Sequence, residues 1–184
     1  MPIADAETGD QVAMFRARLR PAAFARYGVL VAAFYNYAYV IPESNDAGFI
    51  DALTGTNYPM ERIYQMERDP TDARSARLEE VGFETSTLTR SWLVNAIDEA
   101  LMDGTLSVHS KVCISELRTF VIKPNGKAEH AVGCHDDCVL ALALLVIGLR
   151  RVASLRLKPY TPQTPAQRSR MVTNYGKRKP IDDD

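Results

Sequence analysis

The chain has 184 residues, of which 46% are hydrophobic and 24% are charged, a balance typical of one soluble globular domain with a real core. We expect no signal peptide or membrane span, because residues 1–10 are acidic and the apolar run Val139–Leu149 is too short to cross a bilayer. The net charge of −1 hides an asymmetry: residues 150–184 carry nine Lys or Arg against three acids, whereas the rest carries 13 against 20.

The first half of the chain alternates β-rich runs with helical signals. Proline favours the first turn of a helix, and glycine commonly follows the last turn. These signals predict a turn over Asp5–Asp10, a strand over Gln11–Arg18, a helix from Pro21 to about Phe34, a strand over Tyr37–Ile41, and a helix from Asp46 to about Leu53 that is capped by Asn45 and ended by Gly55.

The second half opens with a short strand and a polar loop and ends in an apolar helix. A stripe of apolar residues at helical spacing marks the central helix of this half. The patterns predict a strand over Arg62–Gln65, a loop over Met66–Gly82, a helix from Leu88 to about Met102, a short helix over Ser110–Leu117, a strand over Arg118–Lys123, a hairpin turn over Pro124–Lys127, and a buried helix over Asp136–Val152.

The alternation of strands and helices predicts an α/β fold in a single domain over residues 1–155. Residues 156–184 form a basic tail that contains prolines, which we expect to be flexible. An acidic body with a basic tail suits a metal-dependent enzyme acting on nucleic acid, although a solvated tail without specific function explains the charge equally well. Three cysteines without a signal segment fit a reduced cytoplasm.

Three carboxylates stand where buried elements end or begin. Glu43 follows a predicted strand that is stopped by Pro42, and the ends of strands in open α/β sheets collect ligand groups. Asp136 and Asp137 open the last helix, whose dipole keeps a carboxylate ionised, as metal binding requires. A solvated turn residue and ordinary helix capping are the structural alternatives.

Two basic residues are candidates for contacts with a nucleic acid. Arg90 lies in the first turn of a helix, where a cation is unfavourable, which indicates a phosphate contact or an ion pair. His135 is a candidate DNA-facing group, or equally a structural histidine. A zinc site at His130, Cys134 and Cys138 is not expected, because structural zinc sites normally use two short-spaced pairs.

Four segments in order resemble the C-terminal nuclease domain of the phage terminase large subunit, which has a ribonuclease-H-like fold. The resemblance extends from about Gln11 to Arg151. The segments are Pro42-Glu43-Ser44-Asn45-Asp46-Ala47-Gly48; Gly82-Phe83-Glu84-Thr85 with Thr89-Arg90; Glu116-Leu117-Arg118-Thr119-Phe120; and Gly133-Cys134-His135-Asp136-Asp137.

The resemblance implies a mixed sheet flanked by helices and two-metal cleavage of double-stranded DNA during genome packaging in the bacterial cytoplasm. Glu43 and Asp137, with Asp136 as neighbour, would hold two Mg²⁺ or Mn²⁺ ions. The implied partners are DNA, the terminase ATPase portion, the small terminase subunit and the portal, and no membrane. Expected DNA contacts are Arg90, His135, Arg168, Arg170, Lys177, Arg178 and Lys179.

The chain also departs from the family pattern. We expect its first strand, which carries a catalytic Asp, to be absent, since the sequence starts near the end of the second strand. No phosphate-binding loop of the ATPase motor occurs. The metal site should therefore be incomplete and cleavage impaired, and the alternative is a non-catalytic DNA-binding or packaging-assembly module.

Overall fold

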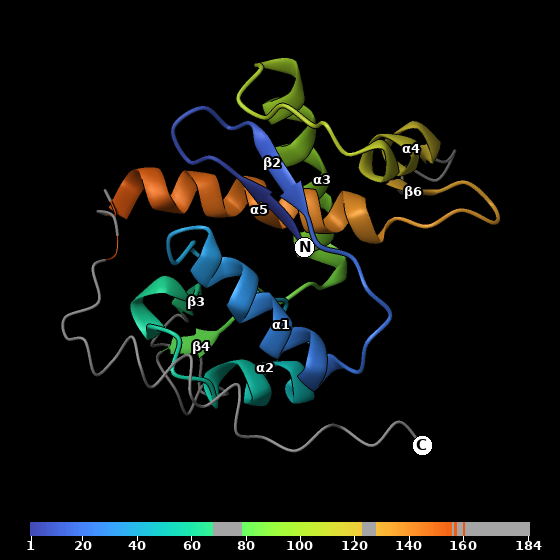
Figure 1. The fold of residues 1–184 in the computed structure, drawn as a ribbon. Coiled ribbons are helices and arrows are strands. Elements are labelled where there is room, and N and C mark those ends of the chain that lie inside the picture. Colours follow the sequence, from blue (N-terminus) through green and yellow to red (C-terminus); the bar gives the residue numbers. More distant parts are fainter. Residues whose placement is uncertain (68–78, 123–127, 156, 158–159, 161–184) are drawn as a thin grey trace.

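The computed structural model describes residues 1–67, 79–122, 128–155, 157 and 160. These residues form a mixed α/β structure (Figure 1). The helices are α1 (Pro21–Phe34), α2 (Ala47–Thr54), α3 (Thr87–Met102), α4 (Lys111–Thr119) and α5 (Asp137–Leu155), with a 3-10 turn η1 (Met60–Arg62). The strands are β1 (Pro2–Ala4), β2 (Gln11–Met14), β3 (Gln65–Glu67), β4 (Glu79–Val81), β5 (Phe120–Ile122) and β6 (Ala128–His130).

The helices begin and end where local capping chemistry dictates. The prediction for α1 is confirmed, with Pro21 at its first position. Ser86 and Thr89 form a reciprocal capping box at the start of α3. Helix α2 is capped by Asp46, whose carboxylate accepts a hydrogen bond from the Phe49 amide at 2.9 Å. The prediction that Asn45 caps this helix is therefore wrong, because the Asn45 side chain is used elsewhere.

The strands form three separate two-stranded antiparallel sheets, β1–β2, β3–β4 and β5–β6. The expected single mixed sheet is not formed by the described residues. Isolated parallel bridges occur instead, among them Val40 to Ile63 and Glu43 to Phe83. Pro42 lies between the two bridges and has no N–H to donate, so a continuous ladder cannot form there. The described residues thus confirm the α/β class, and the ribonuclease-H-like arrangement stays a prediction.

The strand boundaries differ from the predicted ones at several places. The strand that begins at Gln11 ends at Met14 instead of Arg18. The predicted loop after Met66 begins and ends in strands β3 and β4, with residues 68–78 outside the described part. The predicted hairpin turn over residues 124–127 also lies outside it, but the flanking strands β5 and β6 pair antiparallel, as a hairpin requires.

Helix α5 is the centre of the larger of two hydrophobic cores. It packs against α3, α4 and β1, and Figure 1 shows the β1–β2 hairpin lying across it. By length and composition α5 is the one described helix that could cross a membrane, a test that a buried core helix also passes. Buried Val139, Leu142 and Ile147 show that packing in the core accounts for this composition.

A second, smaller core joins α1 and α2, which pack on each other. Its buried residues include Ala25, Val29, Leu53 and Ile63. The segment around Ile41 connects the two cores, because Ile41 packs against the larger core while Val40 packs against the smaller one. Ile41 lies so close to Gly148 of α5 that a Cβ at position 148 would be 2.1 Å from Ile41 Cδ1.

Candidate functional site

The segment that contains Glu43 is held by backbone hydrogen bonds to the segment before α3. The Phe83 amide donates to the Pro42 carbonyl at 2.8 Å, and the Ser44 amide donates to the Phe83 carbonyl at 3.0 Å. The Asn45 side chain donates to Glu43 Oε1 at 3.1 Å and to the Thr85 carbonyl at 2.9 Å. Glu43 itself is exposed. Its carboxylate therefore projects from a well-fixed backbone, and Asn45 ties it to the second segment.

Gly82 permits this close approach of the two segments. Its φ angle is +98°, a conformation that favours glycine. A Cβ at this position would lie 3.0 Å from the Pro42 carbonyl oxygen and 3.1 Å from Ser44. A side chain at position 82 would consequently push apart the two segments that fix Glu43.

Asp136 contacts basic side chains from two other elements. Arg90 of α3 donates a short hydrogen bond to Asp136 Oδ2, and His130 Nδ1 of β6 lies 3.4 Å from the same oxygen. Burial of the Asp136 carboxyl opposes its ionisation, but the contacts with Arg90 and His130 outweigh burial and hold its pKa below the ordinary value. The ion-pair alternative for Arg90 is thus confirmed, and its guanidinium is engaged with protein.

The first turn of α5 is also held by a buried carboxylate that sequence reasoning gave no role. Glu116 of α4 accepts a hydrogen bond from the Cys138 amide at 2.7 Å through Oε2, and its Oε1 lies 3.3 Å from Arg16 Nη1. Burial, followed by the contact with Glu116, raises the pKa of the Cys138 thiol to about 12. Cys138 is therefore a neutral packing residue, and Glu116 fixes the start of the helix that carries Asp137.

Asp137 and His135 lie in a surface hollow with two arginines that were not predicted as site residues. The hollow has a volume of about 440 Å³ and is lined by Arg16, Ala17, Arg18, His135 and Asp137. The side chains of Asp137, His135 and Arg18 are exposed. Arg16 and Arg18 alternate in the extended segment after β2, so the period-2 pattern of the predicted strand was the signal that could have found them.

The remaining predicted site residues are not assembled into a metal centre. In the part of the chain that the structure describes, no group of three or more His, Cys, Asp or Glu side chains is placed to hold a metal ion. Glu43, Asp136 and Asp137 therefore do not form such a group. The tail candidates Arg168, Arg170, Lys177, Arg178 and Lys179 lie outside the described residues.

Comparison of the chain with protein-family models, with curated proteins and with solved structures gives no match.

Proposed function

We propose that the chain is the nuclease portion of a phage or prophage terminase large subunit, which cleaves double-stranded DNA during genome packaging. The arrangement is a ribonuclease-H-like domain, and the substrate is the DNA duplex. The proposal rests on the resemblance of four segments and on one structural observation that supports it.

That observation is a series of contacts that joins the first segment to the second, and the second and third to the start of α5. The first segment bonds the second through the Pro42–Phe83 backbone contact and through Asn45. The second bonds the fourth through Arg90 and Asp136. The third bonds the helix that follows the fourth through Glu116 and the Cys138 amide. Because these segments lie far apart in sequence, their mutual contacts are what a shared site requires.

The carboxylates of this region do not fit a complete two-metal site. Asp136 already pairs with Arg90 through Oδ2, and the same oxygen lies beside His130, so this oxygen is committed to basic side chains of the protein. Glu43 and Asp137 remain as exposed oxygen donors on different segments. A centre for two divalent cations needs several carboxylates grouped around both ions, and the described residues provide no group of three such ligands. We therefore assign DNA cleavage to an assembly in which at least one further carboxylate is supplied, and we derive no metal-dependent step for the described residues alone.

The second candidate is a non-catalytic DNA-binding or packaging-assembly module. The absence of a three-ligand group among the described residues favours it. In this case the fold retains the contacts that connect the four segments, while Glu43 and Asp137 have no chemical task. The two candidates differ in whether activity can be restored by adding a carboxylate-bearing strand.

The deciding experiment measures nicking of supercoiled plasmid in Mn²⁺ by the 184-residue chain, alone and with a separately produced strand that carries an Asp. We expect weak or no cleavage alone and measurable cleavage after complementation. Asp137→Asn and Glu43→Gln should abolish the restored activity, because each removes a candidate oxygen donor. The matched control is Asp98→Asn, an exposed acid of α3, which should leave it unchanged.

Two outcomes would contradict the proposal. Robust cleavage by the chain alone, lost in Asp137→Asn, would show that no further carboxylate is needed. Failure of every carboxylate-bearing strand to restore cleavage, with the fold intact by circular dichroism, would favour the non-catalytic module.

A further inference from the structure

After α5 ends, the chain comes back to the smaller core at Tyr160. Helix α5 belongs to the larger core and ends at Leu155, whereas the Tyr160 ring contacts Tyr37, which packs on the smaller core. The two ring centroids lie 4.5 Å apart with an interplanar angle of 47°. The guanidinium of Arg62 lies 5.8 Å from the centroid of the Tyr160 ring, within the range of a cation–π contact. Tyr160 therefore contacts two elements that lie far from it in the sequence.

The backbone of Tyr37 is in a conformation that few tyrosines adopt. Its φ angle is +54°, and that of the preceding Asn36 is +56°. Asparagine tolerates the left-handed region, but a bulky residue there is strained and persists only when its surroundings hold it. Two rings contact Tyr37: Tyr160, and Tyr58 with its centroid 5.9 Å away. The Tyr58 hydroxyl also donates to the Ala38 carbonyl at 2.5 Å, which fixes the next residue.

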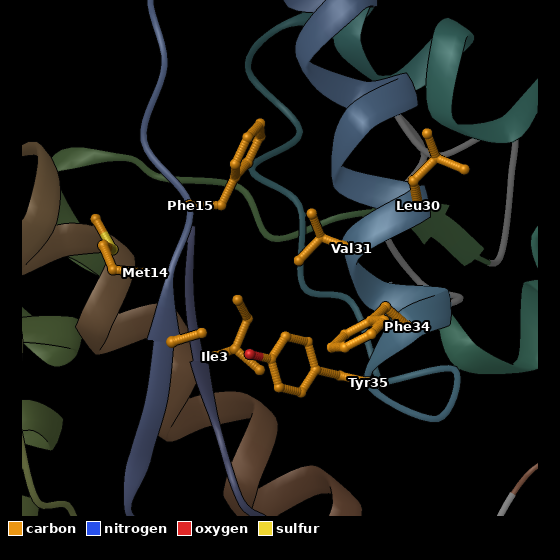
Figure 2. Close-up of a pocket in the computed structure, with 8 residues that line it drawn as sticks. Ile3, Met14, Phe15, Leu30, Val31, Phe34 and Tyr35 are labelled. Atoms are coloured by element: carbon orange, nitrogen blue, oxygen red, sulfur yellow. The ribbon is translucent and has the colours of Figure 1, made fainter.

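The last turn of α1, which precedes Tyr37, has an apolar cavity of about 390 Å³ beside it. The cavity separates this turn from the β1–β2 hairpin, and Figure 2 shows Val31, Phe34 and Tyr35 next to it. Phe34 is 82% exposed. A gap in packing forfeits the contacts that would otherwise hold the turn on this side. The position of the turn consequently depends on the contacts of residues 36–38, which follow it.

We propose that Tyr160 is the anchor of a conformational switch. When its ring lies on Tyr37 and Arg62, it holds Tyr37 in the left-handed conformation and keeps the last turn of α1 in place. When the ring leaves, this part of the smaller core opens locally, while the larger core stays folded. The anchor also attaches the basic C-terminal region to the smaller core instead of to the end of α5. The inference requires no catalysis and stands apart from the proposed nuclease activity.

The test is amide hydrogen exchange of the 184-residue chain, measured by NMR. The reporting amide is that of Ala38, which donates to the Ala32 carbonyl at 2.9 Å. The reference is the amide of Leu142, a buried residue within α5. We expect Tyr160→Ala to speed exchange of the Ala38 amide about tenfold and to leave that of Leu142 unchanged, because the effect is local. Tyr160→Phe should keep the protection, since both contacts of Tyr160 use the ring.

Two further variants separate the anchor from a general effect of losing a tyrosine. Tyr27→Ala changes a tyrosine of α1 that is 52% exposed, and it should leave the Ala38 amide unchanged. In a Tyr37→Ala background, Tyr160→Ala should add little, because the partner ring is already absent. Unchanged exchange of Ala38 in Tyr160→Ala, equal loss of protection in Tyr160→Phe, or equal acceleration of Leu142 would overturn the proposal. These readouts are independent of DNA cleavage, so the proposed function can fail without affecting them.

Discussion

At the scale of single residues, the contact between Arg90 and Asp136 determines how two predicted site residues can act. The guanidinium side chain is 29% exposed and the carboxylate side chain 16% exposed, so the pair is shielded from most of the surrounding water. The positive charge of Arg90 therefore holds the start of α5 in place through its ion pair with Asp136. A contact between Arg90 and a DNA phosphate would first have to break this ion pair.

We predict that Arg90→Gln lowers the free energy of unfolding by about 1–3 kcal/mol at pH 7, because a half-buried carboxylate loses its main donor. The folded state lowers the pKa of Asp136. The stabilisation is therefore complete above the ordinary carboxyl pKa and is lost as the pH falls through the folded-state pKa. Urea unfolding at pH 7 and below about pH 3 measures both effects.

The difference between wild type and Arg90→Gln should shrink at the lower pH. Arg118→Gln, which changes an exposed arginine of α4, should alter stability by no more than about 0.5 kcal/mol at either pH. A difference for Arg90→Gln that does not depend on pH would assign its effect to packing of the side chain instead of to the ion pair.

At the scale of elements, the helices could be predicted closely and the pairing of strands could not. The start of α1 follows from Pro21 and that of α4 from Ser110, which are local signals. Whether Pro42 and Ser44 bond Phe83 depends on a partner about 40 residues away in the chain, which no local pattern encodes. The cap of α2 was predicted at Asn45 but lies at Asp46, because the Asp46 carboxylate accepts from the Phe49 amide while the Asn45 side chain is turned toward Glu43 and the distant Thr85 carbonyl.

The acidic residues of the candidate site could be singled out from the sequence, whereas only some of its basic residues could. Glu43 and Asp137 could be singled out as candidates because proline and the helix start mark their positions. Arg16 was missed because its partner Glu116 lies 100 residues later. Arg18 was missed because the period-2 pattern that it shares with Arg16 was interpreted only as part of a strand and not as one side of a site.

We predict that the start of α5 depends on Glu116 as an acceptor. Glu116→Ala should lower the free energy of unfolding by about 1–3 kcal/mol, because the buried Cys138 amide loses its partner. Glu116→Gln should cost less, since its side-chain carbonyl can still accept that hydrogen bond. Thermal unfolding gives the stability, and exchange of the Cys138 amide locates the effect. Glu99→Gln, which breaks the exposed pair with Arg150, should cost at most about 1 kcal/mol.

If Glu116→Gln lowered the free energy of unfolding as much as Glu116→Ala, the main contribution of Glu116 would be its charge contact with Arg16. In that case Arg16→Gln should produce the same loss of stability, which it should not do if the Cys138 amide is the main partner of Glu116.

At the scale of the whole molecule, charge is divided between an acidic body and a basic C-terminal region. We predict that residues 158–184 carry most of the DNA affinity, because Arg168, Arg170, Lys177, Arg178 and Lys179 can neutralise phosphates. Binding should be independent of DNA sequence, with a log–log salt slope of about −0.9 for each phosphate contacted. Fluorescence anisotropy across a salt series should show a shallower slope for a chain ending at Leu157.

An unchanged affinity and salt slope after this truncation would place the DNA surface on the body. The hollow with Arg16, Arg18 and His135 would then be its first candidate. Arg18→Gln in the truncated chain should in that case reduce the salt slope by about 0.9, as expected for one lost phosphate contact.

The close approach of Ile41 to Gly148 restricts how this sequence can evolve. A methyl group at position 148 would favour the helix by about 1 kcal/mol, yet it would collide with Ile41 in the connection between the two cores. A smaller residue at position 41 must therefore appear before, or together with, any larger one at position 148. Related sequences should show positions 41 and 148 changing together. The order of those changes would indicate which of the two cores adjusted its packing first.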